Sequence, residues 1–412
     1  MSGGTRSYEM ARRLVAKGHE VHMITSWRDG GDGNDWFLTE EAGIQVHWLP
    51  IAYSNHMNFG QRIKAFLRFA LASSRKAASI KADLIFATST PLTIAIPGVY
   101  ASKRQRIPMV FEVRDLWPEI PIAMGALKNP ILRFTAQRLE RWAYRNARAV
   151  VALSPGMKAG VVRAGYPRGQ IAVIPNSSDI DIFSDVDGGL IDHVRCERGW
   201  LGDGPLLIYT GTFGLINGVG YMVNLAQHLL DIAPEIRILL VGDGVEYQKV
   251  LADADNAGVL NRNLFIEQQV PKRDIPALLS IADMASSLVI DKPEMRANSA
   301  NKFFDSLAAG KPIMINYGGW QADLLESNDA GVVTWQMDIK EAAEMLAKTL
   351  GDKDWLAKAG VSSRRLAEQL FSRDQLASQL EEVLVRAVEG NQWMVSEIAP
   401  GEYALANVDE TK

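Results

Sequence analysis

Short runs of apolar residues alternate along this chain with stretches in which apolar residues recur at helical spacing. Met10, Leu14 and Val15 mark a first helix that we expect to end at Gly18, and residues 19–25 are predicted to form the strand that follows. Strands are predicted next at residues 45–49, 83–88, 109–113, 149–153 and 172–174, and in a second series at residues 206–210, 237–241, 264–268, 285–290, 313–316 and 332–335. Continuously apolar strands that alternate with helices predict an α/β protein whose parallel sheets are covered on both faces.

The two series of strands indicate two doubly wound domains facing a cleft, at residues 1–178 and 179–370. Between the two series, residues 176–203 are rich in Asp, Ser and Gly without a clear period, and are predicted to be the interdomain connection. Residues 371–390 are expected to form a C-terminal helix that packs on the body, and residues 391–412 a mobile tail. Folds of this class bind ligands at the carboxyl ends of their strands, so we expect the site in the cleft.

The composition narrows the class of function. Lys and Arg number 44 against 48 Asp and Glu, a net charge of −4, so no overall basic field points to nucleic acid. The one cysteine, Cys196, excludes an intramolecular disulfide and a Cys-rich zinc site, and the six histidines show no metal-ligand spacing. Because no apolar run is long enough to span a bilayer and no signal peptide opens the chain, we expect a cytoplasmic protein.

The most informative stretch, residues 298–312, supplies small polar residues where a helix should begin. Free amides of Ser299, Ala300 and Asn301, with Lys302 in the first turn, are suited to bind a diphosphate. Asp305 lies one turn further in and can accept hydrogen bonds from ribose hydroxyls. An ordinary helix, capped by residue 298 or 299 and ended by a glycine at residue 310, fits the same spacing about equally well.

Glycine-rich turns follow two strands of the second series. Gly211 and Gly214 stand where backbone amides can approach a phosphate, and Gly242 opens a similar turn. Neither turn has the spacing of a dinucleotide fingerprint, because the third glycine position of the latter is Tyr247. A hydride-transfer enzyme is therefore disfavoured.

Charged residues follow the predicted strand at residues 109–113. Asp115 and Glu119 can hold a sugar hydroxyl or a reacting proton at the cleft. A structural ion pair of Arg114 with Glu119 or with Glu112 is an equally good interpretation.

Residues 59–81 form a basic amphipathic segment with an apolar stripe. Such a segment can lie on an anionic bilayer or meet a phosphorylated lipid, although most segments of this kind are solvated helix faces over a core.

In order and spacing these segments resemble glycosyltransferase family 4, a retaining family with the GT-B fold of two facing Rossmann-like domains. The resemblance runs from Gly3-Gly4-Thr5-Arg6 through Arg114-Asp115-Leu116-Trp117-Pro118-Glu119 to Ala308-Ala309-Gly310-Lys311-Pro312. Within the family, the chain resembles bacterial enzymes that build colanic acid, capsule or O-antigen units on polyprenyl diphosphate.

The resemblance implies a nucleotide-sugar donor bound mainly by the second domain and a lipid-linked saccharide acceptor bound mainly by the first. The family mechanism is a front-face displacement that needs no metal, no other cofactor and no protein nucleophile. The catalytic candidates are Asp115 and Glu119, which would address the sugar or the acceptor. The donor-binding candidates are Gly3, Gly4, Gly211, Gly214, Gly242, Ser299, Ala300, Asn301, Lys302 and Asp305.

The chain departs from the family pattern at several positions. The first glutamate of the family's Glu-x7-Glu motif falls at Ala297, and the usual phosphate-binding arginine and lysine fall at Thr212 and Asn217. No residue near the predicted nucleobase site, residues 267–272, distinguishes one base from another. Two alternatives to a glycosyltransferase stay open. One is a nucleotide-sugar 2-epimerase of the same architecture, and the other is a non-catalytic nucleotide-sugar-binding subunit of a polysaccharide assembly complex.

Family members begin with a strand that leads into the glycine-rich turn, here Gly3-Gly4. This chain shows a helix pattern directly after Gly4. We therefore expect the first domain to lack that strand, which would leave the neighbouring strands unpaired. Either the start codon has been placed too late or the first domain is weakened.

Overall fold

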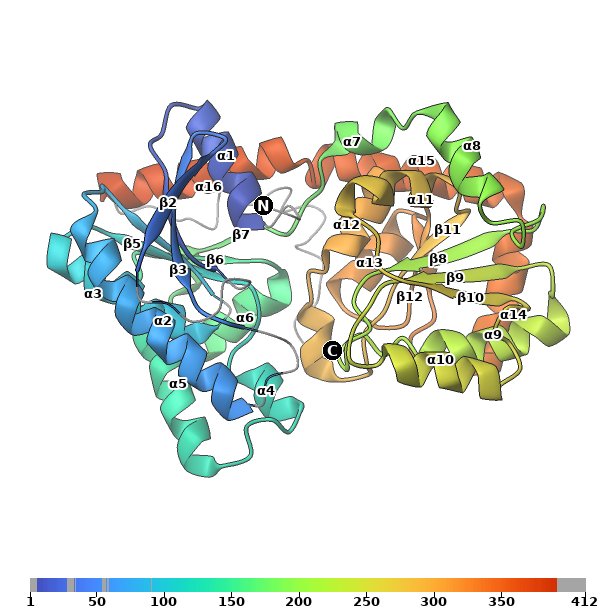
Figure 1. Cartoon of the computed structure of the whole chain (residues 1–412), viewed down its shortest axis with the longest axis horizontal. Coiled ribbons are helices and arrows are strands. Elements are labelled where there is room, and N and C mark those ends of the chain that lie inside the picture. The colour runs from blue at the N-terminus through green and yellow to red at the C-terminus, as the bar shows by residue number, and fades with distance from the viewer. Residues whose placement is uncertain are drawn as a thin grey trace.

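The computed structural model describes residues 6–27, 33, 35–53, 57, 59–89 and 91–390. The described residues form two α/β domains side by side, with a pair of long helices along one edge of the molecule (Figure 1). The expected α/β fold with parallel sheets is confirmed. Gly3, Gly4 and the predicted tail at residues 391–412 lie outside the described residues.

The C-terminal domain is built on a six-stranded sheet in which every strand pair is parallel, in the order β10-β9-β8-β11-β12-β13. Its strands are β8 (Leu206–Thr210), β9 (Arg237–Val241), β10 (Leu264–Glu267), β11 (Met284–Ser287), β12 (Ile313–Ile315) and β13 (Gly331–Val333). Its helices are α9 (Tyr221–Ile232), α10 (Tyr247–Asn256), α11 (Ile275–Ser280), α12 (Asn301–Ala308), α13 (Trp320–Ser327), α14 (Ile339–Gly351) and α15 (Lys353–Leu370).

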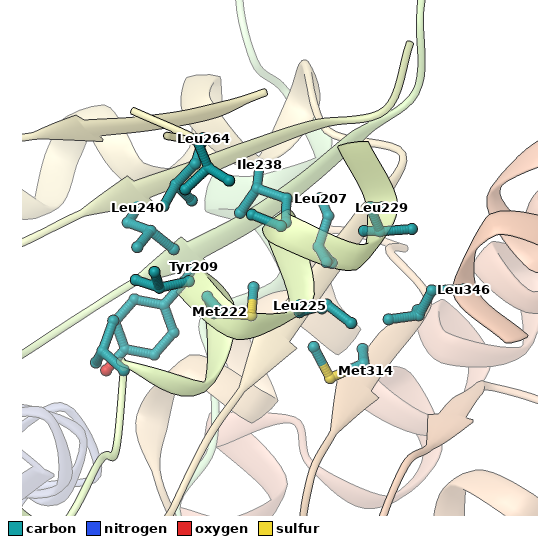
Figure 2. Packing of buried hydrophobic residues seen from close by; sticks show 14 of the residues in the cluster. Leu207, Tyr209, Met222, Leu225, Leu229, Ile238, Leu240, Leu264, Met314 and Leu346 are labelled. Carbon is teal, nitrogen blue, oxygen red and sulfur yellow. The ribbon is translucent and has the colours of Figure 1, made fainter. Parts of the chain in front are cut away.

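Both faces of this sheet are covered, as the continuous apolar runs predict. On one face Leu207 and Tyr209 of β8 pack with Leu225 of α9 and Leu346 of α14 (Figure 2). On the other face the alternate residues of β8, including Ile208, pack against α11. Period-two alternation thus places apolar side chains on each face in turn.

The strands of the N-terminal domain fall into two separate sheets. One has the parallel order β4-β5-β6-β7, and the other the order β1-β3-β2, with β1 and β3 parallel. The strands are β1 (His22–Trp27), β2 (Phe37–Glu41), β3 (Ile44–Pro50), β4 (Ile85–Thr88), β5 (Met109–Val113), β6 (Ala149–Ala152) and β7 (Ile171–Val173). The helices are α1 (Arg6–Ala16), α2 (Phe59–Ser79), α3 (Ala95–Gln105), α4 (Glu119–Ala123), α5 (Pro130–Arg145) and α6 (Pro155–Arg163).

Two features of these sheets differ from a continuous parallel sheet. Strand β2 is antiparallel to β3 and was not predicted, because its sequence Phe-Leu-Thr-Glu-Glu has neither a continuous apolar run nor an apolar alternation. Among the described residues, β1 pairs only with β3 and β4 only with β5. The expectation that strands of the first domain are left unpaired is therefore met at one edge of β1 and one edge of β4.

The connection between the domains is more ordered than its sequence predicted. It contains the short helices α7 (Ile180–Ser184) and α8 (Gly188–Cys196). Residues 176–203 therefore contain regular structure although their sequence shows no clear period. Helix α8 packs on the second sheet through Val194, so tertiary contacts, and not a long period, specify it.

The last helix, α16 (Arg373–Glu389), returns from the C-terminal domain and covers the first sheet. Leu376, Leu380 and Val383 pack with Val110 of β5 and Met10 of α1. Arg373 and Arg13 of α1 both bind Asp179, which joins α16, α1 and the connection.

A buried ion pair holds α1 on the same sheet. Arg6 Nε donates to Glu112 Oε1 of β5 at 2.8 Å, and its other nitrogens donate to the carbonyls of Ile174 and Pro175 after β7. Burial alone would raise the pKa of Glu112, but nearby arginines and a hydrogen bond from Thr88 hold that pKa below its usual value. The side chains of Arg6 and Glu112 are 3% and 1% exposed, so each depends on the other for its charge balance.

Removing one member of this pair should cost far more stability than removing an exposed charge. We expect Glu112→Gln to lower the free energy of unfolding by about 3–5 kcal/mol, because it leaves the Arg6 guanidinium buried without a counter-charge. The double variant Arg6→Met/Glu112→Leu should lose clearly less than the sum of the two single variants. Urea denaturation measures both. Asp253→Asn, which breaks the exposed pair of Asp253 with Lys249, is the control, and an equally small effect of Glu112→Gln would contradict the assignment.

Candidate active site

The Gly211 turn after β8 is joined to the turn after β9 by backbone hydrogen bonds. Gly211 N donates to Val241 O and Phe213 N donates to Asp243 O, each at 2.9 Å. A β-carbon on Gly242 would lie 1.8 Å from Gly211 O, so no other residue fits between the two turns. Gly211 and Gly242 therefore lie together, and Gly242 acts through close packing of backbone.

Lys302, in the first turn of α12, lies directly against the Gly211 turn. Its Nζ donates to Tyr209 Oη at 2.7 Å and lies 4.2 Å from the centroid of the same ring, while Tyr209 Oη donates to Thr212 O at 2.8 Å. A β-carbon on Gly211 would lie 2.8 Å from Lys302 Nζ. The structure thus brings together Lys302 and Gly211, which are 91 positions apart in the chain.

The ammonium of Lys302 has no counter-ion within the described part of the chain. Its hydrogen bond is to a neutral phenol, and no carboxylate of the described residues pairs with it. Burial lowers the pKa of Lys302 to about 7 and raises the pKa of Tyr209. A bound anion would therefore supply the charge that this lysine lacks.

Asn217 occupies the position of a phosphate-binding lysine in the family pattern. In the amide orientation that satisfies both of its polar ends, Nδ2 donates to Thr212 O at 3.0 Å and Oδ1 accepts from Lys302 Nζ at 3.2 Å. Asn217 thus positions Lys302 and the turn instead of contributing a charge.

The N-terminus of α12 has no side-chain cap. The N-cap residue is Ala300, in an extended conformation, and its side chain accepts no hydrogen bond. Asn298 Oδ1 accepts from Ala300 N at 3.4 Å before the helix, but neither Asn298 nor Ser299 stands at the N-cap, whereas Gly310, with φ +62°, does stand at the helix end. The amides of the first turn next to Lys302 therefore lack a cap from a side chain, as an anion site requires.

Ser299 lies between the two domains. It is 8% exposed, its Oγ accepts from Asn176 N at 3.1 Å, and its carbonyl accepts from Asn176 Nδ2. Ser154 Oγ, at the start of α6, donates to Ala297 O at 2.7 Å, and a β-carbon on Gly156 would meet Ala297 at 2.8 Å. The N-terminal domain therefore holds the segment that precedes α12, and the small side chain of Ala297 permits that contact.

Asp305 faces the interdomain connection. Its Oδ1 accepts a hydrogen bond from Ser178 Oγ at 2.7 Å, and burial raises its pKa. The carboxylate thus lies one turn beyond Lys302 and is oriented by a residue outside its own domain. Its predicted contact with ribose stays a prediction.

The charged segment after β5 reaches the domain interface. Glu119 begins α4 and pairs with Arg163 of α6 at 3.1 Å, not with Arg114, while the charge of Arg114 helps to lower the pKa of Glu112. Ile120, the next residue, packs against the apolar cluster of the C-terminal domain. Asp115 lies half-buried in the turn before α4. The segment is therefore placed opposite the second domain, and the catalytic roles of Asp115 and Glu119 stay predictions.

Sequence reasoning missed Tyr209, Asn176 and Ser178. Tyr209 lies on a strand and is buried, so its sequence position signals core; only the tertiary contact with Lys302 reveals a polar role. Asn176 and Ser178 lie in the predicted connection, but the sequence indicates no partner for either of them. Their hydrogen bonds run to α12 and to the segment before it, far away in the chain. The described residues contain no group of three His, Cys, Asp or Glu side chains arranged to hold a metal ion.

Two domain families match this chain. Residues 3–177 match the Glycosyl transferase 4-like domain, and residues 193–365 match Glycosyl transferases group 1. The chain is 24% identical over 303 residues to WcaI of Escherichia coli K12, named as a colanic acid biosynthesis glycosyl transferase, across 70% of this chain and 73% of WcaI. It is 21% identical over 389 residues to N-acetyl-alpha-D-glucosaminyl L-malate synthase of Bacillus anthracis, across 92% of each chain.

Solved structures share the fold at low sequence identity. HepE of Anabaena, determined with UDP and glucose, superposes with a TM-score of 0.66 at 18% identity, over 89% of this chain and all of that chain. WaaG, a glycosyltransferase of lipopolysaccharide biosynthesis, superposes with a TM-score of 0.66 at 16% identity, over 92% and 95% of the two chains.

Proposed function

Because the chain belongs to glycosyltransferase family 4 and has the GT-B fold, we propose that it transfers a sugar from a nucleotide-sugar donor to a saccharide carried on polyprenyl diphosphate. The transfer retains the anomeric configuration and serves the synthesis of a cell-surface polysaccharide such as O-antigen or capsule. The glycosyltransferase class is shared with its relatives, among them WcaI and WaaG, whose names refer to colanic acid and lipopolysaccharide biosynthesis.

The donor assignment rests on one observation. The ammonium of Lys302 has no counter-ion among the described residues, and it lies beside the start of α12, which no side chain caps. A nucleotide-sugar diphosphate brings negative charge, and the HepE complex contains UDP. Lys302, the Gly211 turn, Gly214 and the first amides of α12 then bind the diphosphate, while Asp305 binds ribose. The nucleobase lies near residues 267–272, where Glu267 is already held by Arg198 at 2.7 Å.

The chemistry proposed is a displacement on the face of the sugar from which the diphosphate leaves. The bond from the anomeric carbon to the β-phosphate oxygen breaks, the acceptor oxygen bonds to that carbon, and the acceptor proton passes to the leaving phosphate. Lys302 and the helix amides stabilise the charge that grows on the leaving group, and positioning of the acceptor supplies the rest. Asp115 and Glu119, opposite this site, orient the donor sugar or the acceptor hydroxyl.

A lipid-linked acceptor requires access to a membrane surface, and the N-terminal domain offers a suitable one. None of the described helices is long and apolar enough to cross a bilayer. Helix α2 exposes Leu71, 67%, in the predicted basic segment, and α5 exposes Ile131 and Phe134, 70% and 59%, among exposed arginines. We place the peripheral contact on α2 and α5 because exposed apolar side chains flanked by basic ones suit an anionic interface.

The function is tested by the mass added to an acceptor. Purified protein is incubated with a bacterial membrane extract and a panel of nucleotide sugars, and polyprenyl-diphosphate saccharides are analysed by mass spectrometry. We expect one hexose or N-acetylhexosamine residue to be added from one donor, with the anomeric configuration of that donor retained in the NMR spectrum of the product. Conversion of a donor without acceptor would instead identify an epimerase, and binding of a donor without transfer would identify a non-catalytic subunit.

The Lys302 assignment predicts a pH dependence of donor affinity. A nucleotide-sugar diphosphate keeps its charge between pH 7 and 9, whereas free Lys302, with its pKa lowered to about 7 by burial, loses its proton over this range. Binding above pH 7 must therefore take up a proton, and the dissociation constant of the preferred donor should rise by up to about tenfold per pH unit. Calorimetric titration measures the effect.

Two variants serve as controls for this prediction. Lys302→Arg keeps its charge at every pH, so its donor affinity should stay nearly constant from pH 7 to 9. Lys302→Met should bind the donor weakly at every pH. A flat profile for the native protein, or native affinity in Lys302→Met, would contradict the diphosphate assignment.

The membrane contact predicts loss of vesicle binding on substitution of α5. We expect Ile131→Ser/Phe134→Ser to reduce sedimentation with vesicles that contain anionic phospholipid by at least about fivefold, because each removes apolar area from the interface. Val361→Ser, at a site 69% exposed on α15, is the matched control and should sediment like the native protein. Equal sedimentation of all three would place the contact elsewhere.

A further inference from the structure

The carboxylate of Asp305 uses one oxygen within the protein and leaves the other open. Its Oδ1 accepts the hydrogen bond from Ser178 Oγ at 2.7 Å. Asp305 is only half-buried, and its Oδ2 receives no hydrogen bond or ion pair from the described residues. An ionised carboxylate has acceptor sites on both oxygens, so Oδ2 can accept from a ligand while Oδ1 stays bound to Ser178.

Ser178 itself is fixed by the main chain around it. It is 1% exposed, its amide donates to Phe371 O at 3.4 Å, and its carbonyl accepts from Arg373 N at 3.3 Å. The side chain of Arg373 also donates to the carbonyl of the preceding residue, Ser177. The Ser178 hydroxyl therefore donates from a fixed position, and it restricts Asp305 to one side-chain orientation.

The same hydrogen bond favours the charge of the carboxylate. Burial raises the pKa of Asp305, and the charge of Asp179 acts in the same direction, whereas the hydrogen bond from Ser178 and the charges of Lys272 and Arg373 lower that pKa. Hydrogen bonds to an ionised acceptor are about twice as strong as those between neutral groups. The hydroxyl of Ser178 thus both orients Oδ2 and strengthens the hydrogen bonds that Oδ2 can accept.

The distance to Lys302 indicates which part of a ligand reaches Oδ2. Lys302 and Asp305 are three positions apart on α12, and side chains at this spacing are neighbours, about 5–6 Å apart at their Cβ atoms. A hydroxyl bound to Asp305 would therefore lie close to a phosphate bound at Lys302. In a nucleoside diphosphate, the ribose is the group that carries hydroxyls next to the phosphates.

We propose that Ser178 is a positioning residue for the donor: it acts through Asp305 and determines the preference of the site for a ribonucleotide. Ser178 does not contact the ligand, and the ribose hydroxyls donate to Asp305 Oδ2. The inference rests on the proposed function, since it requires a nucleoside diphosphate at Lys302. It goes beyond that function because it gives the interdomain connection a part in substrate selection.

The proposal is tested with ligands that differ only in the ribose. Calorimetric titration gives the Kd of UDP, GDP and ADP and of their 2′,3′-dideoxy analogues, and the ratio of dideoxy to ribose Kd is taken for the base that binds most tightly. We expect a ratio of at least about tenfold in the native protein and of at most about threefold in Ser178→Ala. The Kd of the dideoxy ligand should stay within about twofold, because Ser178 acts only on the ribose contact. Both ligands carry the same diphosphate, so effects at Lys302 cancel in the ratio.

A double-variant cycle shows whether Ser178 acts through Asp305. Asp305→Asn should lower the ratio as Ser178→Ala does, and the double variant should bind both ligands like Asp305→Asn alone. Ser363→Ala is the matched control, because Ser363 is also fully buried and its Oγ donates within the protein, to Ala330 O at 3.0 Å. This control should keep the native ratio. If Ser178→Ala does not fold, Ser178→Cys, with a weak donor of similar size, gives the same readout.

Three results would overturn the proposal. The native ratio in Ser178→Ala would show that the hydroxyl is not needed for ribose preference. An equal loss of affinity for both ligands would give Ser178 a purely structural role. Binding of a nucleoside diphosphate without ribose preference in the native protein would remove the Asp305 contact but leave the diphosphate assignment intact, whereas no binding of any of the three nucleotides would overturn the proposed function as well.

Discussion

The buried pair of Arg6 and Glu112 is the constraint from which the arrangement of the N-terminal domain follows. A guanidinium and a carboxylate removed from water must stay together, and this pair joins the start of α1 to β5 and to the carbonyls after β7. Glu112 is also three residues before Asp115, so the sheet edge that the pair fixes is the edge from which the segment with Asp115 and Glu119 leaves. An arginine that the sequence suggests only as part of a family motif therefore sets the frame of half the molecule.

Most strands could be predicted because their apolar runs are continuous, and β5, β8 and β9 occur at the residues expected. The misses have physical reasons. Strand β2 is an edge strand without an apolar run or alternation, and α7 and α8 are too short to show a period. The strand expected at residues 285–290 ends at Ser287, because the amides of Val289 and Ile290 donate to the Asn316 side chain and to Ile216 O and not to a neighbouring strand.

The site could be predicted only where a residue type at its position in the local sequence has a clear chemical use. Lys302 and Gly211 could be named because a lysine in the first turn of a helix and a glycine in a strand-to-helix turn both suit a phosphate. Tyr209, which receives the lysine, could not, since a tyrosine on a buried strand is indistinguishable from core before the fold is known. Glu119 shows the converse: its partner Arg163 lies on another helix, and no local spacing indicates that pair.

The chain crosses between the domains twice, and the two crossings lie side by side. Ser178 of the connection and Ser372 before α16 form a parallel bridge, with Arg373 N donating to Ser178 O at 3.3 Å. Because the two crossings are adjacent, they oppose sliding of one domain past the other more than rotation about their common line. Ser178 lies on the line and also holds Asp305, so the carboxylate one turn from Lys302 sits at the axis, where opening and closing displace it least.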